Sequence, residues 1–250
     1  MRKMESSQPG NASDAGEVGS RWSSLYKVGG LAAFFAIAVM IIEFIVLTIW
    51  PPPTTVLGWF TLFQSNRLLG LVDYGILDAV IVAFLGPMFV ALYFALRRSN
   101  GTYVAVAVPF VFAGIASYWA TNSSLAMLYL SDLYAAATSD AQRSAYLAAG
   151  QALNAVGQYG LLYSMGFFLV TIAGLIVSIA MLRSGVFSRT VAYVGIVGNV
   201  FLLLNYVSLA LASTNISWLV VFVGIGAILS FVWWVFTGLR LYQIGRSLPK

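Results

Sequence analysis

The sequence contains no cysteine and no histidine. These absences exclude disulfides and thiolate chemistry, and they remove the residues from which most zinc sites and catalytic triads are built. A serine nucleophile would have no histidine base, and lysine occurs only at positions 3, 27 and 250, so a serine–lysine pair is excluded as well. We therefore expect no enzyme, no metal site and no cofactor, and we assign no catalytic residue.

Charge is also scarce. Only 8% of the 250 residues are Asp, Glu, Lys or Arg, whereas soluble domains carry about 25%. The apolar residues, 60% of the chain, occur in long blocks and not in the short alternating segments of an outer-membrane barrel. The pattern predicts an all-α, polytopic membrane protein, a bundle of six transmembrane helices at about 26–50, 64–98, 101 onward, 157–182, 189–211 and 218–242.

The chain divides into a tail and one membrane domain. Residues 1–21 mix both charge signs with Ser, Gly and Pro and have no apolar core, which predicts a disordered cytoplasmic tail and not a signal peptide. Residues 22–250 form the six-span domain. Pro87 and Pro109 lie near the middle of the second and third spans, where we expect kinks.

Two connections between spans carry helical signals. After the prolines at 51–53, the segment 54–63 has an amphipathic spacing that predicts a short interfacial helix, with its apolar face formed by Val56, Trp59, Phe60 and Phe63. Ser139 and Gln142 have the spacing of a capping box. A helix should therefore start at Asp140 and form an extracytoplasmic segment before the fourth span.

The basic residues predict the orientation. Arg67 and Arg143 fall on one side of the predicted bundle, while the other eleven basic residues fall on the opposite side: Arg2, Lys3, Arg21, Lys27, Arg97, Arg98, Arg183, Arg189, Arg240, Arg246 and Lys250. Basic residues are enriched in cytoplasmic loops, so both termini should be cytoplasmic in a cytoplasmic (cell) membrane protein. Because these residues are dispersed and form no cluster, we expect the lipid bilayer as a partner and no nucleic acid.

Three acidic residues lie inside predicted spans, where a carboxylate is costly unless it is neutral, paired or facing water. Glu43 and Asp78 fall at similar depth in the outer half of the bilayer, and Asp73 lies closer to the surface. Each also has a structural interpretation. Glu43 or Asp78 could be protonated and join helices by hydrogen bonds, and Asp73 could be a solvated end group or the partner of Arg67.

Other polar residues are predicted in the same half of the bilayer. We therefore expect a polar pocket open to the outside, with the candidate ligand-binding residues Glu43, Asp73, Asp78, Tyr118, Asn122, Gln158, Tyr159 and Asn205.

Four segments resemble a known family. They are LFQSNRLLG at 62–70, the termination at 91–98, SLAMLYLSDLYAAATSDAQRSAYLAAGQAL at 124–153, and IAGLIVSIAMLRSGVFSRTVAYVGIVGNV at 172–200. Together they resemble the bacterial and archaeal six-span membrane proteins grouped as domain of unknown function 4386. The resemblance implies a fold and a membrane location, and it carries over no activity and no catalytic residue.

Three functions remain open. The first is a binding or sensing protein with a pocket in the outer leaflet for a small-molecule or lipid ligand. The second is a proton-linked carrier that uses Glu43 and Asp78, and the third is a structural subunit of a membrane complex. A carrier needs a polar path to the cytoplasmic side, a sensor needs only a closed-bottom pocket, and a structural subunit needs neither. The sequence sets no oligomeric state.

Overall fold

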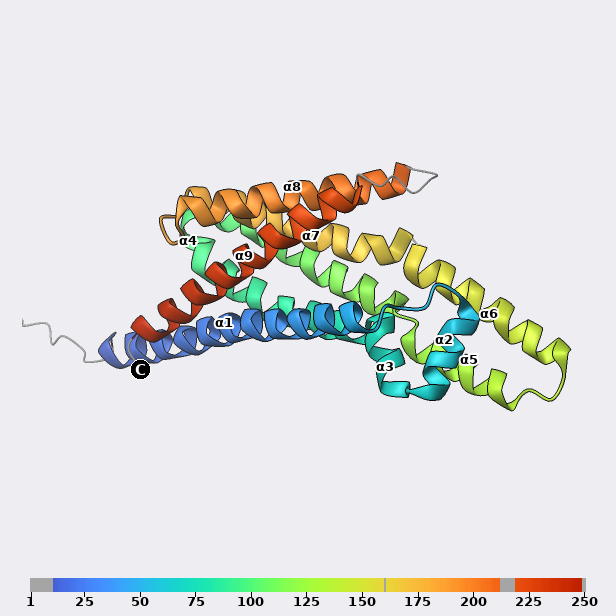
Figure 1. Cartoon of the computed structure of the whole chain (residues 1–250). Coiled ribbons are helices and arrows are strands. Elements are labelled where there is room, and N and C mark those ends of the chain that lie inside the picture. Colours follow the sequence, from blue (N-terminus) through green and yellow to red (C-terminus); the bar gives the residue numbers. More distant parts are fainter. Residues whose placement is uncertain (1–10, 160, 212–218, 249–250) are drawn as a thin grey trace, which may run out of the picture.

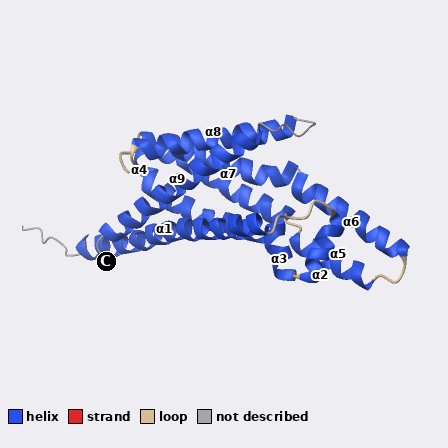
Figure 2. Cartoon of the chain, viewed as in Figure 1, coloured by secondary structure: helices blue, strands red, loops and turns tan. Residues whose placement is uncertain are grey.

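The computed structural model describes residues 11–159, 161–211 and 219–248, and side chains within 22–156, 165–208 and 221–248. The described chain is helical and contains no strand (Figure 2). Its elements are α1 (Asn11–Ile49), α2 (Val56–Ser65), α3 (Arg67–Leu71), the π-helical turn η1 (Val72–Ile76), α4 (Leu77–Thr121), α5 (Ser124–Ala136), α6 (Asp140–Tyr159), α7 (Leu161–Leu182), α8 (Arg189–Leu211) and α9 (Leu219–Ser247).

The lengths and apolar surfaces of these helices indicate a membrane-embedded protein. Five helical stretches in the described chain are long and apolar enough to cross a bilayer: Trp22–Ile49, Arg67–Ala136, Met165–Leu182, Arg189–Ser208 and Val221–Ser247. Large apolar side chains such as Phe44, Ile228 and Phe236 are exposed on their outer faces. In water such surfaces would be unstable, whereas in a bilayer they contact lipid.

The stretch Arg67–Ala136 is not one rod, because α4 turns back on itself at Asn100. The backbone there leaves the helical region (φ −146°, ψ 42°), and the two arms of α4 run antiparallel (Figure 1). A Cβ added at Gly86 would lie 3.4 Å from the Phe112 ring of the other arm. The Asn100 side chain donates a hydrogen bond to the Ala180 carbonyl of α7 (3.1 Å), which holds the turn against its neighbour. Pro87 and Pro109 lie within helical backbone, one in each arm.

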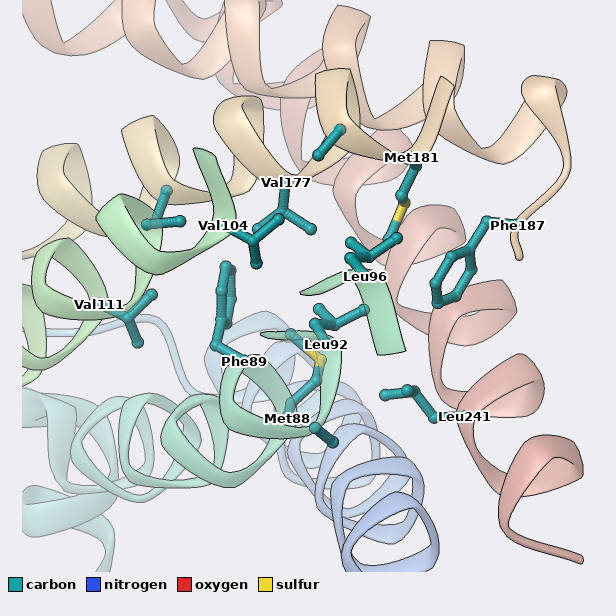
Figure 3. Close-up of a cluster of buried hydrophobic side chains, with 14 of the residues drawn as sticks. Met88, Phe89, Leu92, Leu96, Val104, Val111, Val177, Met181, Phe187 and Leu241 are labelled. Atoms are coloured by element: carbon teal, nitrogen blue, oxygen red, sulfur yellow. The ribbon is translucent and has the colours of Figure 1, made fainter. Parts of the chain in front are cut away.

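The long helices form a closed ring. Helix α1 packs against α4 and α9, α4 against α7, and α8 against α7 and α9. Side chains from the ring meet in one core, shown in Figure 3: Met88, Phe89, Leu92, Leu96, Val104, Val111, Val177, Met181, Phe187 and Leu241, none more than 6% exposed. Because lipid is as apolar as leucine, this core stabilises the bundle by close packing and not by removal from water.

Helices α2, α3, α5 and α6 form a cap at one end of the bundle (right in Figure 1), with a second small core. The predicted apolar face of α2 is buried, and Trp59 and Phe63 are at most 1% exposed. Its partners are Met127 of α5 and side chains of α6, so protein and not lipid covers this face. The interpretation of α2 as a helix that rests on the membrane through these residues is therefore wrong.

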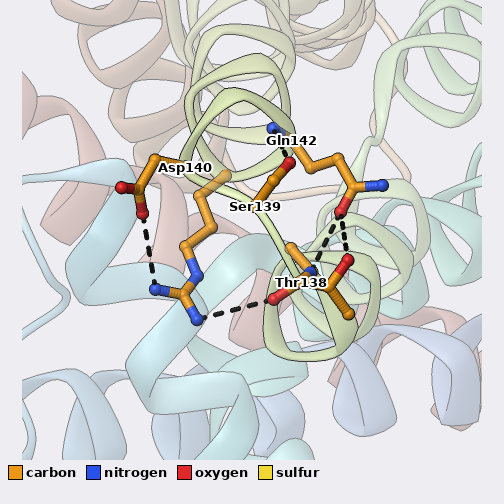
Figure 4. A network of polar contacts seen from close by, with 6 residues as sticks. Thr138, Ser139, Asp140 and Gln142 are labelled. Carbon is orange, nitrogen blue, oxygen red and sulfur yellow. Dashed lines mark hydrogen bonds and ion pairs between the residues drawn. The ribbon is translucent and has the colours of Figure 1, made fainter.

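Helix α6 begins at Asp140, where its capping box predicted a start. The Ser139 hydroxyl accepts a hydrogen bond from the backbone N–H of Gln142 (3.3 Å; Figure 4). In return, the side-chain oxygen of Gln142 accepts one from the backbone N–H of Thr138 (3.0 Å). Together these bonds satisfy backbone donors that have no partner inside the helix. Helix α6 ends at Tyr159 and α7 begins at Leu161, so the cap leads almost directly into a long helix of the ring.

One boundary differs from the sequence prediction. Helix α1 begins at Asn11, inside the segment 1–21 that we expected to be disordered, and residues 1–10 lie outside the described part. The second arm of α4, which the sequence predicted from residue 101 onward, ends at Thr121. The described ends of α1 and α9 and the turn at Asn100 lie at the end of the bundle opposite the cap (left in Figure 1).

Candidate functional site

The candidate site is built around an interruption of the second long helix at Gly75. Gly75 has φ 101° and ψ 24°, a conformation that L-residues with a side chain rarely adopt, and it lies within the π-helical turn η1. π-Helical turns are rare and are often found at functional sites. The break frees a backbone carbonyl within an apolar helical stretch, where it needs a partner.

Two side chains from the second arm of α4 and its end satisfy this carbonyl. Tyr118 donates its hydroxyl to the Gly75 oxygen (3.1 Å), and Asn122 donates its side-chain amide to the same oxygen (3.0 Å). The other end of the Asn122 side chain accepts the backbone amide of Ser124 (3.3 Å). Asn122 therefore ends α4 and also fixes the broken helix beside it.

The acidic side chains of α1 and α4 meet just after the break. Glu43 is only 9% exposed, and its carboxylate accepts a hydrogen bond from the backbone amide of Asp78. Asp78 lies in the first turn of α4, where backbone amides have no partner within the helix. Glu43 thus caps α4 from a neighbouring helix, and the partial positive charge of the helix N-terminus favours a carboxylate there.

Asp78 has polar neighbours on three helices. Glu43 of α1 lies beside it, and the Tyr118 hydroxyl lies close enough to its carboxyl to hydrogen-bond with it. Tyr206 of α8 is close enough to interact with it electrostatically. Asp78 therefore lies close to polar groups of other helices. The ion pairs of the described residues, Arg67–Asp132 and Arg143–Asp140, lie elsewhere. Two neighbouring carboxylates repel each other, so this pair is most stable with a proton or a cation between them.

Asp73 does not have the partner that the sequence suggested. Arg67 forms its ion pair with Asp132 of α5 (2.7 Å), in the exposed part of the cap. One carboxylate oxygen of Asp73 is buried without a hydrogen-bond partner among the described residues. The expected pairing of Asp73 with Arg67 is therefore wrong, because Asp132, a residue distant in sequence, pairs with the arginine. Asp73 itself is half-buried, so a partly solvated end group stays a prediction.

The remaining candidates divide into described and undescribed side chains. Asn205 of α8 is 4% exposed and lies next to Tyr206. The side chains of Gln158 and Tyr159 lie outside the described residues. Gly75 was not predicted as the centre of the site, although a glycine directly after Asp73 and Tyr74 in an apolar run is a weak signal for a helix break.

Tyr74 was also missed, and it connects the break to the cap. Its hydroxyl donates a hydrogen bond to the Asn154 side chain of α6 (3.2 Å). Its ring packs edge-on against Trp59 of α2, with 4.8 Å between the centroids. The cap is therefore joined directly to the residue before Gly75, so the cap and the helix break are mechanically linked.

The composition of the site limits its ligands. The described residues contain no group of three or more Asp or Glu side chains that could hold a metal ion. The site instead offers carboxylates, phenols and amides, which suit a ligand with a positive charge or hydrogen-bond donors. No family model, no curated protein and no solved structure matches the chain.

Proposed function

We propose that this membrane protein binds a small ligand, cationic or rich in hydrogen-bond donors, at the Glu43–Asp78 site. One observation carries the proposal: two carboxyl groups from different helices meet at an interrupted helix, with no ion-pair partner among the described residues. A bound cation would separate the two negative charges. Ionisable residues inside membrane proteins are costly and commonly mark ligand or ion sites.

The topology proposed from the sequence sets the side from which a ligand enters. The chain crosses the cytoplasmic membrane six times, since the two arms of α4 are separate spans, and both termini are cytoplasmic. The cap and the Glu43–Asp78 site then belong to the outer half of the bilayer. The chain is proposed to belong to the family of domain of unknown function 4386, on the segments quoted above.

The test compares ligand stabilisation of the wild type and Asp78→Asn. The purified proteins are screened by thermal unfolding against a panel of primary amines, quaternary ammonium ions and amino acids, at one acidic and one alkaline pH. A ligand at about 100 times its Kd stabilises a protein by about 2.7 kcal/mol. We expect a cationic compound to stabilise the wild type, and Asp78→Asn to fold with near-wild-type stability but lose this effect.

The control is Asp132→Asn, which removes an exposed carboxylate of the cap and should keep the ligand response. If Asp78→Asn responds to the same compounds as the wild type, Asp78 only joins helices and the proposal fails. If no compound stabilises the wild type and Asp78→Asn is equally stable, the structural-subunit hypothesis is favoured instead.

A proton-linked carrier is the second candidate, and the interruption of the helix at Gly75 favours it. Many secondary transporters bind substrate and coupling ions where a transmembrane helix is broken. In a carrier, Glu43 and Asp78 would hold a proton between them and release it as the substrate moves. Uptake driven by a pH gradient, lost in Asp78→Asn, would distinguish a carrier from a protein that only binds.

A further inference from the structure

A line of buried polar residues follows the interface of α7, α8 and α9, away from the cap. Five members are at most 6% exposed: Thr171 and Ser178 of α7, Asn199 and Asn205 of α8, and Thr237 of α9. These helices otherwise pack through apolar side chains. Polar side chains buried in a membrane bundle need an explanation, because each one costs free energy unless it has a partner.

The three helices meet closely at Gly195 of α8. A methyl group at this position would collide with the Ser178 hydroxyl of α7 and the Trp233 indole of α9. One turn further along α8, Asn199 packs against Gly174 of α7. The polar groups of the line therefore lie next to each other across the helix boundaries.

Hydrogen bonds between helices do not explain these polar contacts. Thr171, Ser178 and Asn199 each donate a described hydrogen bond to the carbonyl four residues earlier in their own helix, at 2.7–2.8 Å. The polar atoms therefore do not hold α7 and α8 together through these bonds. Their side-chain oxygens keep lone pairs that can accept hydrogen bonds from water.

Helix α9 adds polar groups without partners. The Trp233 ring nitrogen and the Ser230 and Thr237 hydroxyls are buried and have no hydrogen-bond partner among the described residues. Trp233 is 1% exposed and Thr237 is fully buried. With Arg240, these residues recur at the spacing of one helix face. A buried polar group without a partner costs about 1–3 kcal/mol, which water would recover.

The line has a polar group at each end. At the cap end, Asn205 lies beside Tyr206, which is within electrostatic reach of Asp78. At the other end, Arg240 lines an open cavity of about 470 Å³ with Ser188 and Gln243. From Arg189 to Tyr206, α8 rises about 25 Å, close to the roughly 30 Å of the hydrocarbon core.

We propose that this line is a water-filled pathway for protons between the Glu43–Asp78 site and the Arg240 cavity. The inference rests on the proposed function, and it favours the carrier over a protein with a closed-bottom pocket. It requires water to reach positions that are buried inside the bundle. The pathway can therefore be tested without knowing the ligand.

The test measures water access with single cysteines, which the cysteine-free chain makes simple. Ser178→Cys and Thr237→Cys place a thiol of similar size on the line. Ala173→Cys and Ala180→Cys are matched controls, since both alanines are buried in the apolar core of α7. Each variant is checked by thermal unfolding, reconstituted in phosphatidylcholine–phosphatidylglycerol liposomes, and treated with 2-aminoethyl methanethiosulfonate.

Thiols react as thiolates, which form where water is present. We expect the two cysteines on the line to react at least about tenfold faster than the two controls. Equal rates would overturn the pathway. If either variant on the line fails to fold, Ser230→Cys takes its place with the same expectation.

This outcome is independent of the ligand experiment. If the cysteines on the line are as slow as the controls but Asp78→Asn loses its ligand response, the pathway is wrong and the binding site stands. If the cysteines react rapidly but Asp78→Asn behaves as wild type, water enters the bundle without serving that site, and the proposed link between them fails.

Discussion

Replacing Gly75 by alanine tests whether the helix break organises the site. At φ 101° the new side chain is strained, at about 1–2 kcal/mol for a left-handed conformation. The added Cβ would also lie 3.1 Å from the Tyr118 hydroxyl, close enough to displace it from the Gly75 carbonyl. A lost hydrogen bond adds about 0.5–1.5 kcal/mol, so Gly75→Ala should destabilise the protein by about 2–3 kcal/mol.

Gly185→Ala is the matched control. Gly185 also has a positive φ of 64°, but no atom lies within 4 Å of its added Cβ. It should therefore show the backbone strain alone, about 1 kcal/mol. The difference in destabilisation between the two variants therefore measures the effect of the contacts with Tyr118 and Asn122.

The assay is equilibrium unfolding in mixed micelles with increasing sodium dodecyl sulfate, followed by circular dichroism. Ligand stabilisation is measured on the same samples. Equal losses of stability in Gly75→Ala and Gly185→Ala would refute the argument that Gly75 is held by its neighbours. Ligand stabilisation in Gly75→Ala that matched the wild type would refute its place at the centre of the site.

Two further predictions concern the cap. Ser139→Ala should cost about 1 kcal/mol of local helix stability, because a backbone amide of α6 loses its partner; unchanged hydrogen exchange over 140–145 would contradict this. A cysteine at Ser144 should react with an impermeant reagent in intact cells while one at Ser99 should not, and the reverse pattern would place the cap in the cytoplasm.

Local signals were sufficient for much of the helical framework. The capping box at Ser139 gave the start of α6, because both partners lie within one turn. The buried face of α2 followed from its helical spacing, although the sequence could not show that α5 and α6 cover it. The turn at Asn100 lies between the predicted end of the second span at 98 and the predicted start of the third at 101.

The site depends on contacts that no local pattern contains. Glu43 and Asp78 were predicted at similar depth, but their contact depends on how α1 packs against α4. The break at Gly75 was not predicted, since a single glycine in an apolar run is also compatible with a continuous helix. Pro87 and Pro109 lie within helical backbone, and the kinks expected there stay a prediction.

The tight turn at Asn100 makes the length of each arm of α4 as important as its composition. Inserting or deleting one residue in an arm would rotate everything beyond it by about 100° and shift it by about 1.5 Å. Only Asn100 leaves the helical conformation between the two arms, so the turn has no further residues that could absorb the change. Such a change between Asn100 and Tyr118 would move both donors away from the Gly75 carbonyl without altering any residue of the site. Relatives that keep this site should therefore tolerate substitutions in the arms far better than changes in their length.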